Sequence, residues 1–190
     1  MITVVTGLPR SGTSLMMQML AAGGLCLLTD GKRAPDADNP RGYFEWERIQ
    51  QLPQDPALIA FGEEKAVKVT SPLLAWLPVG RQYRILLMRR PIEEVFASQT
   101  VMIRRRGTSG GALGPEPLMR AMEDHLRLVM AGMERRPDCR IHLVAYHALL
   151  AEPRRESEAI RDFLEVDLDV AAMAAQVDPS LYRQRRAVAP

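Results

Sequence analysis

The amino-acid sequence predicts an α/β fold with three layers, in which helices cover both faces of a mostly parallel sheet of about five strands. Two observations support this prediction. Short apolar runs alternate with segments of helical periodicity, and clusters of glycine, proline and other breakers separate them. The length of 190 residues suits one domain, so residues 1–190 are expected to form a single domain.

The composition is that of an ordinary globular protein. Apolar residues make up 47% and charged residues 25% of the chain, and the net charge of +2 is too small to indicate nucleic-acid binding. No apolar run reaches the roughly 18 residues that cross a bilayer, and no basic segment precedes an N-terminal apolar stretch. We therefore expect no membrane partner and a cytoplasmic location. Cys26 and Cys139 lie in apolar runs and are expected to be buried free thiols.

The expected elements follow one another in the order of a doubly wound sheet. The first strand, Ile2–Thr6, leads through a loop into a helix over Leu15–Leu20. In such sheets ligands bind at the carboxyl ends of the strands, so the residues that follow each strand are the first candidates for a site. The other expected strands are Leu25–Thr29, Ala66–Thr70, Arg84–Met88 and Arg140–Ala145, and the other expected helices are Leu73–Leu77, Ile92 to about Arg105, Pro117 to about Arg135, His147–Leu150 and Pro153–Leu164.

The loop after the first strand has the spacing of a phosphate-binding loop. Gly7 and Gly12 bound it, and Thr13 and Ser14 open the helix whose N-terminus favours an anion. This pattern predicts a fold like that of the P-loop nucleotide triphosphatases. Thr13, however, stands where those proteins carry a lysine, and the loop's own cation is Arg10, so a triphosphate ligand is disfavoured. A strand-to-helix turn with incidental glycines is the alternative.

Cations also follow the third and fourth expected strands. Lys68 lies near the end of the third strand, where it either faces the same crevice as Arg10 or lies on the surface. Arg89 and Arg90 end the fourth strand, at a place where magnesium-dependent nucleotidases usually carry an aspartate. This arrangement favours phosphate binding without a metal. The three histidines have no metal-ligand spacing with the cysteines, so no metal site is expected.

Three further segments lie outside the expected strands and long helices, and two of them are open to more than one interpretation. Residues 30–42 are rich in breakers and are expected to form a loop. The aromatic residues of the following segment, 43–47, either pack against the core or face a substrate. The basic segment 178–186 is either a solvated end or folds over an anion.

Two of these motifs resemble those of the sulfotransferases that use 3′-phosphoadenosine 5′-phosphosulfate (PAPS). The segment from Pro9 to Ser14 is similar to the family's loop for the 5′-phosphosulfate. The segment from Arg90 to Ser98 resembles its motif for the 3′-phosphate, in which an arginine and a serine eight residues later bind that group. The resemblance covers most of the chain. It implies transfer of a sulfuryl group from PAPS, which becomes 3′-phosphoadenosine 5′-phosphate (PAP), to a hydroxyl or amine of an unidentified small-molecule acceptor, without a metal.

The resemblance also implies roles for individual residues. In the cytosolic branch of the family a histidine after the third strand is the catalytic base, but Thr70 stands at its place here. Glu45 and Glu47 are the nearest candidates for the base, with Asp38 behind them, and Arg10 and Lys68 complete the expected catalytic set. The expected nucleotide-binding residues are Pro9, Arg10, Ser11, Gly12, Thr13, Ser14, Ser98, Arg90 or Arg89, and Arg183, which with Arg185 and Arg186 could replace a basic segment that the cytosolic branch carries and this chain lacks.

Two other functions remain compatible with the sequence. The chain could be a small-molecule kinase or another phosphotransferase, with Asp30 as a magnesium ligand and Arg10 in place of the absent lysine. It could also be a nucleotide-binding protein without catalytic activity, which kept the loop and lost the base. Magnesium dependence separates the kinase from the sulfotransferase.

Overall fold

The computed structural model describes residues 1–105, 107 and 114–182. Within these residues the chain forms a five-stranded sheet in the order β2-β3-β1-β4-β5, and all neighbouring strands are parallel. The strands are β1 (Ile2–Gly7), β2 (Leu27–Leu28), β3 (Ala66–Lys68), β4 (Tyr83–Arg89) and β5 (Cys139–Ala145). The predicted parallel α/β sheet is confirmed.

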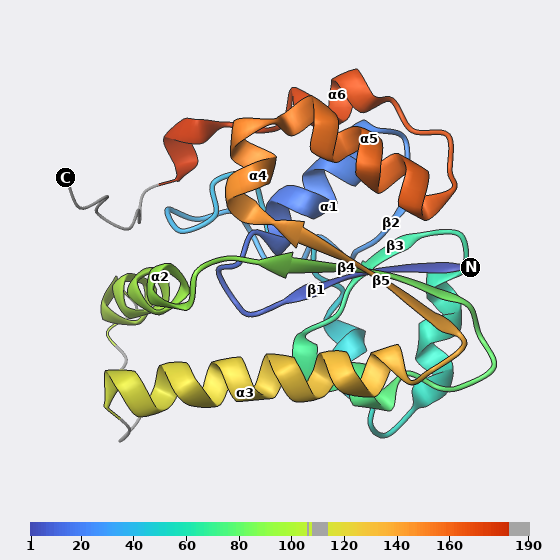
Figure 1. The fold of residues 1–190 in the computed structure, drawn as a ribbon, viewed down its shortest axis with the longest axis horizontal. Coiled ribbons are helices and arrows are strands. Elements are labelled where there is room, and N and C mark those ends of the chain that lie inside the picture. Colours follow the sequence, from blue (N-terminus) through green and yellow to red (C-terminus); the bar gives the residue numbers. More distant parts are fainter. Residues whose placement is uncertain (106, 108–113, 183–190) are drawn as a thin grey trace.

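Helices cover both faces of the sheet, as predicted (Figure 1). One face carries α1 (Thr13–Ala22), α4 (Tyr146–Ala151), α5 (Pro153–Leu164) and α6 (Val170–Ala174). The long helix α3 (Pro115–Glu134) lies on the opposite face, and α2 (Ile92–Arg105) follows the carboxyl end of β4. Short 3₁₀ helices complete the fold: η1 (Glu47–Gln51), η2 (Pro56–Gly62), η3 (Ser71–Trp76) and η4 (Pro179–Leu181).

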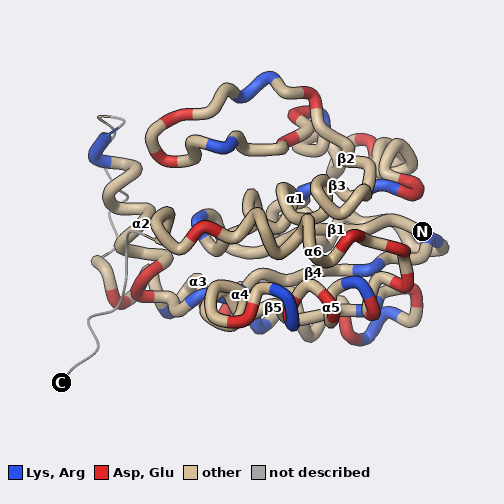
Figure 2. The backbone as a smooth tube through the Cα atoms, turned by 90° about the horizontal axis from the view of Figure 1, so that it is seen from above, with Lys and Arg blue, Asp and Glu red and all other residues tan. Residues whose placement is uncertain are grey.

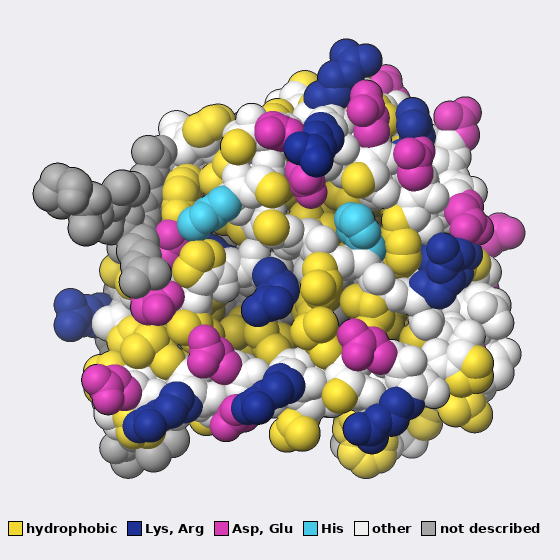
Figure 3. Space-filling view, viewed as in Figure 1, with side chains coloured by type: hydrophobic (Ala, Val, Ile, Leu, Met, Phe, Trp, Pro, Cys, Tyr) yellow, Lys and Arg dark blue, Asp and Glu magenta, His cyan; other side chains and the backbone are white. Residues whose placement is uncertain are grey.

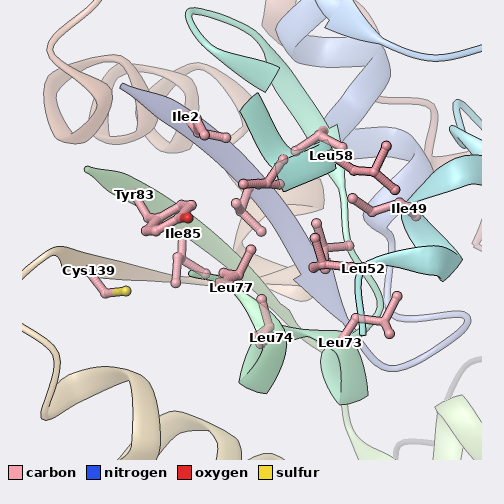
Figure 4. Packing of buried hydrophobic residues seen from close by; sticks show 14 of the residues in the cluster. Ile2, Ile49, Leu52, Leu58, Leu73, Leu74, Leu77, Tyr83, Ile85 and Cys139 are labelled. Carbon is pink, nitrogen blue, oxygen red and sulfur yellow. The ribbon is translucent and has the colours of Figure 1, made fainter. Parts of the chain in front are cut away.

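Two hydrophobic clusters hold the layers together, because side chains alternate between the faces of each strand. Ile2 and Val4 of β1 point into the cluster beside α3 and the 3₁₀ helices (Figure 4). Val5 points into the other cluster, where it packs with the buried methionines of α1. The central strand β1 is therefore buried on both faces, and this packing fixes the position of the first residue of the loop that follows it.

Some boundaries and one burial prediction differ from the structure. The second strand is two residues long rather than five, because it lies at the sheet edge and pairs only with β3. The segment expected as a helix over Leu73–Leu77 is the 3₁₀ helix η3. Cys139 is buried, and burial raises the pKa of its thiol to about 11. Cys26 is exposed, and the prediction of its burial was wrong, since it precedes the short edge strand.

Hydrophobic side chains are visible on the face that carries β5, around α3 (Figure 3), and Leu128 and Leu143 are 73% and 44% exposed. In the described part of the chain, no helix is both long enough and apolar enough to span a membrane.

Candidate nucleotide-binding site

A cavity of about 660 Å³ opens at the carboxyl ends of β1, β3 and β4. It lies where the strand order reverses around β1, which is the usual ligand site of an open parallel sheet. Its lining joins segments far apart in sequence: the loop after β1, the end of β3, the second half of α2 and a long loop after β2. The lining includes Gly12, Thr13, Ser14, Lys68, Arg90 and Ser98.

The loop after β1 has a backbone that requires glycine at both ends. Gly12 has φ of +104°, and a Cβ atom there would lie 2.6 Å from the Tyr146 ring. A Cβ atom on Gly7 would lie 2.5 Å from Ser11 Oγ and 2.8 Å from the carbonyl oxygen of Met88. Arg10 itself has φ of 75°, a left-handed conformation that is uncommon for arginine. The loop is thus tightly packed, and it delivers the N-terminus of α1, whose first N–H groups favour an anion, to the cavity.

Arg10 and Ser98 meet at one end of the cavity although 88 residues separate them. The Nε atom of Arg10 donates to Ser98 Oγ over 3.0 Å, and its Nη2 donates to the carbonyl oxygen of Asp38 over 2.9 Å. Arg90 Nη1 donates to the carbonyl oxygen of Arg10 over 3.2 Å. Burial lowers the pKa of Arg10 from its ordinary value, and the nearby Arg90 charge lowers it further. Arg90 thus lies against the backbone of Arg10, and both arginines line the same cavity, which is a setting that favours an anionic ligand.

Arg90 forms an ion pair with the buried carboxylate of Glu94. Its Nε donates to Glu94 Oε2 over 2.9 Å, and the two side chains are 8% and 2% exposed. The Arg90 guanidinium also lies 5.0 Å from the ring centres of both Tyr146 and Tyr182. The Tyr182 hydroxyl donates to Glu94, and burial raises the pKa of that tyrosine to about 12. The neighbouring Arg89 is exposed and does not line the cavity.

Lys68 lies under the other side of the phosphate loop and is 7% exposed. Its ammonium group donates to Ser14 Oγ over 2.8 Å and to the carbonyl oxygen of Tyr43. Burial lowers the pKa of Lys68 to about 8, against the opposing effect of Glu45, whose Oε1 lies 3.9 Å from the Lys68 Nζ. The lysine is therefore a cation at neutral pH that can lose its proton in a mildly alkaline range.

The long loop after β2, residues 30–46, covers one side of the cavity, and we call it the strap. Figure 2 shows it running beside β2 with basic and acidic residues in alternation. Inside the strap, the Tyr43 hydroxyl contacts both carboxylate oxygens of Asp36 at 2.7 Å, and the Arg33 guanidinium stacks 3.3 Å from the Tyr43 ring centre. Outside it, Arg105 of α2 pairs with Asp38 over 2.8 Å. The strap is held in shape mainly by side chains.

The three carboxylates considered for a catalytic base have different surroundings. Glu45 lines the cavity, is 39% exposed, and accepts two hydrogen bonds of 3.1 Å from Arg33 Nη1. Glu47 also lines the cavity but is 68% exposed and pairs with Lys32. Asp38 is 9% exposed and is occupied by Arg105. Glu45 is thus the carboxylate nearest to Lys68 and the phosphate loop.

Most of the residues expected at the site line the cavity. They are Pro9, Arg10, Gly12, Thr13, Ser14, Glu45, Glu47, Lys68, Arg90 and Ser98. Ser11 does not: it is 1% exposed, and its Oγ has no hydrogen-bond partner among the described residues. Arg183, Arg185 and Arg186 lie outside the described residues. In the described part of the chain, no group of three or more His, Cys, Asp or Glu residues could hold a metal ion.

Several contributors to the site could not be assigned from the sequence. Asn39 donates from its side chain to Ser14 Oγ over 2.8 Å, and Arg33 holds Glu45. Glu94 lies under Arg90, and Tyr146 packs on Gly12. Only the contact between Arg90 and Glu94 had a local signal in the sequence, because a glutamate four residues after an arginine can form an i,i+4 ion pair. The other contacts depend on how the strap and α4 fold against the loop.

The comparison with solved structures identifies the fold, whereas the two sequence comparisons found no match. No family model and no curated protein sequence matches the chain. Among solved structures, the chain is similar to a sulfotransferase domain from the curacin biosynthetic pathway, with a TM-score of 0.55 and 15% identity, over 99% of this chain and 92% of that one. The predicted resemblance therefore holds at the level of structure: this chain has the fold of a sulfotransferase domain, with the P-loop-like parallel sheet.

Proposed function

We propose that this protein is a sulfotransferase that binds PAPS in the cavity and transfers its sulfuryl group to a small-molecule hydroxyl or amine. The observation that carries the proposal is the convergence of Arg10, Arg90 and Ser98 beside the glycine-bounded loop. A nucleotide with phosphates at both the 5′ and the 3′ position needs two anion sites, and the cations that line this cavity, Arg10, Lys68 and Arg90, would supply them. The shared fold with a sulfotransferase domain supports the same conclusion.

The residues present fit such a donor. The glycine-bounded loop and the start of α1 would hold its 5′-phosphosulfate with Arg10, Thr13 and Ser14, and Arg90 with Ser98 would hold its 3′-phosphate. The bound donor supplies an activated sulfuryl group with PAP as the leaving group. Lys68, buried and positively charged at neutral pH, would stabilise negative charge near the loop.

Glu45 is proposed as the general base that takes the proton of the acceptor. It is the carboxylate that lines the cavity within 3.9 Å of Lys68. Since Arg33 holds it by two hydrogen bonds, an acceptor that reaches Glu45 must share or displace that contact. Arg33 thereby fixes the direction of the carboxylate before the acceptor binds.

The test is a comparison of nucleotides by calorimetry on the purified protein. We expect PAP to bind at least about tenfold more tightly than AMP, because the 3′-phosphate gains charge-assisted hydrogen bonds from Arg90 and Ser98. Arg90→Ala should remove this preference, whereas Arg89→Ala, which alters the exposed neighbouring arginine, should retain it within about twofold. Ser98→Ala provides a second variant, because Arg90→Ala removes the guanidinium partner of the buried Glu94 and can unfold the protein.

The same preparation separates the other two functions. Equal affinity for PAP and AMP would overturn the assignment. Transfer of sulfur from labelled PAPS to a panel of acceptors, without added metal, distinguishes a sulfotransferase from a magnesium-dependent kinase that uses ATP. Tight PAP binding without turnover on any acceptor would instead favour a nucleotide-binding protein without catalytic activity.

A further inference from the structure

The hydroxyl group of Ser14 lies where the phosphate loop, β3 and the strap meet. It accepts a hydrogen bond of 2.8 Å from Asn39 Nδ2 of the strap and another of 2.8 Å from Lys68 Nζ of β3. The hydroxyl itself donates to the carbonyl oxygen of Tyr43 over 3.4 Å. Ser14 is the second residue of α1 and lines the cavity. Its orientation is therefore set by groups that are 25 and 54 residues distant in sequence.

The hydrogen-bonding capacity of a hydroxyl group decides where the Ser14 proton points. A serine hydroxyl has one proton and two lone pairs. An amide nitrogen and an ammonium group are donors only, so Asn39 and Lys68 use both lone pairs. The remaining proton has the Tyr43 carbonyl at 3.4 Å, which is longer than the usual range of about 2.5–3.0 Å for O–H···O bonds. That carbonyl also accepts from Lys68.

Resting on the proposed function, we propose that Asn39 is a positioning residue that turns the Ser14 O–H toward the cavity, so that it donates to the 5′-phosphosulfate of the bound nucleotide. Because Asn39 and Lys68 occupy both lone pairs, Ser14 can act on a ligand only as a donor, and the 3.4 Å bond to the Tyr43 carbonyl is the one that a phosphate oxygen would replace. Asn39 would then act on the nucleotide through Ser14, without touching the nucleotide's phosphate itself.

The strap holds Asn39 in place independently of Ser14. The backbone N–H of Asn39 donates to the Asp36 carboxylate over 2.9 Å and to the Asp36 carbonyl oxygen over 3.1 Å. The same carboxylate accepts from the Tyr43 hydroxyl at 2.7 Å. Because the backbone is fixed by these bonds, Asn39→Ala removes the amide donor and leaves the turn intact, and Asn39→Asp replaces that donor by an acceptor of the same shape.

The experiment is a double-mutant cycle read by calorimetric affinity for PAP. Ser14→Ala is expected to weaken binding at least about tenfold, and Asn39→Ala about three- to tenfold, because each removes the same donated hydrogen bond to phosphate. In the Ser14→Ala background, Asn39→Ala should change affinity by less than about twofold. Asn39→Asp should weaken binding more than Asn39→Ala, since the carboxylate attracts the Ser14 proton and repels the phosphate.

The control is Arg41→Ala, which removes the bonds from the strap to the Gln176 carbonyl oxygen and the Asp178 carboxylate without removing a bond to Asp36, Asn39 or Ser14. The fold loss in PAP affinity that this variant causes should be the same in the wild-type protein and in the Ser14→Ala background. Melting curves of every variant verify that it is folded. The proposal is overturned if Asn39→Ala causes the same fold loss in PAP affinity with and without Ser14→Ala, since Asn39 would then only stabilise the strap.

The outcome is separable from that of the proposed function. If wild-type protein binds PAP no better than AMP, the sulfotransferase assignment fails, but the cycle can be repeated with AMP, whose 5′-phosphate would meet the same hydroxyl. If PAP is preferred over AMP and the cycle shows no coupling, the sulfotransferase assignment stands and the role of Asn39 falls. Wild-type protein that binds neither nucleotide overturns both.

Discussion

The two sides of the cavity are built in different ways. On the phosphate side, the groups stand on the ends of strands and the starts of helices: Gly7 ends β1, Lys68 ends β3, and Arg90 lies between β4 and α2. On the strap side, the shape of residues 30–46 depends mainly on side chains such as Arg33, which stacks on Tyr43 and binds Glu45. The groups proposed to bind phosphate are thus positioned by the sheet, whereas the proposed base depends on a loop that can change without altering the fold.

The largest expected effect tests whether the strap supplies the base. Glu45→Gln should lower turnover at least about 100-fold, because general-base catalysis contributes roughly 100- to 10,000-fold, while PAP affinity stays within about twofold. The matched variant is Glu47→Gln, which alters the more exposed carboxylate paired with Lys32 and should lower turnover by less than about threefold. Steady-state kinetics with the best acceptor from the panel measure both. Equal losses in the two variants would show that neither glutamate is the base.

The second prediction compares the rigidity of the two sides through two glycines. Gly12 and Gly42 have φ of +104° and +96°, so alanine is strained at both by about 1–2 kcal/mol. A Cβ atom at Gly42 finds its nearest neighbour at 3.7 Å, but at Gly12 it meets the Tyr146 ring at 2.6 Å. Gly12→Ala should therefore lower the free energy of unfolding by about 1–3 kcal/mol more than Gly42→Ala. Urea unfolding of both variants measures the difference, and equal losses would contradict a more rigid phosphate side.

The smallest effect concerns the contact between the two sides at Lys68. Its pKa of about 8 means that the ammonium form dominates below pH 8 and the neutral amine above it. A bound phosphate favours the ammonium form, so PAP affinity should fall as pH rises from 7 to 9, by at most about tenfold per pH unit above the pKa. The PAP affinity of Lys68→Arg should not fall in this way between pH 7 and 9, because a guanidinium group stays charged over that range. An equal fall of PAP affinity with pH in the wild type and in Lys68→Arg would assign the pH dependence to another group.

The phosphate side was largely predictable from the sequence. Its residues follow strands in a local pattern: the glycines of the loop, Arg10, Lys68 after β3, and Arg90 eight residues before Ser98. A parallel sheet brings the carboxyl ends of its strands to one edge, so local patterns there suffice to predict spatial neighbours. The spacing to Ser98 favours Arg90 over Arg89, and the structure adds that Arg90 lines the cavity whereas Arg89 is exposed.

The strap contacts could not be predicted for a physical reason. Residues 30–42 show no hydrophobic period, so nothing local indicates that Asn39 reaches Ser14 or that Arg33 folds over Tyr43. The burial of Glu94 was also beyond the sequence, since a glutamate in the first turn of a helix is usually an exposed residue that favours the helix dipole. In both cases the contact forms only after distant segments have packed together.

The register of the central strand has a consequence for how the protein acquires its activity during folding. Val5 of β1 is aligned with Lys68 of β3, and Gly7 with Met88 of β4, so the site requires pairings between segments that are more than 60 residues apart. A slip of one residue between β1 and β3 would turn Lys68 to the opposite face of the sheet. Such non-local pairings form slowly and late in folding. The ability to bind a nucleotide would therefore mark the end of folding, and the bound nucleotide would stabilise only the chain with the correct strand alignment.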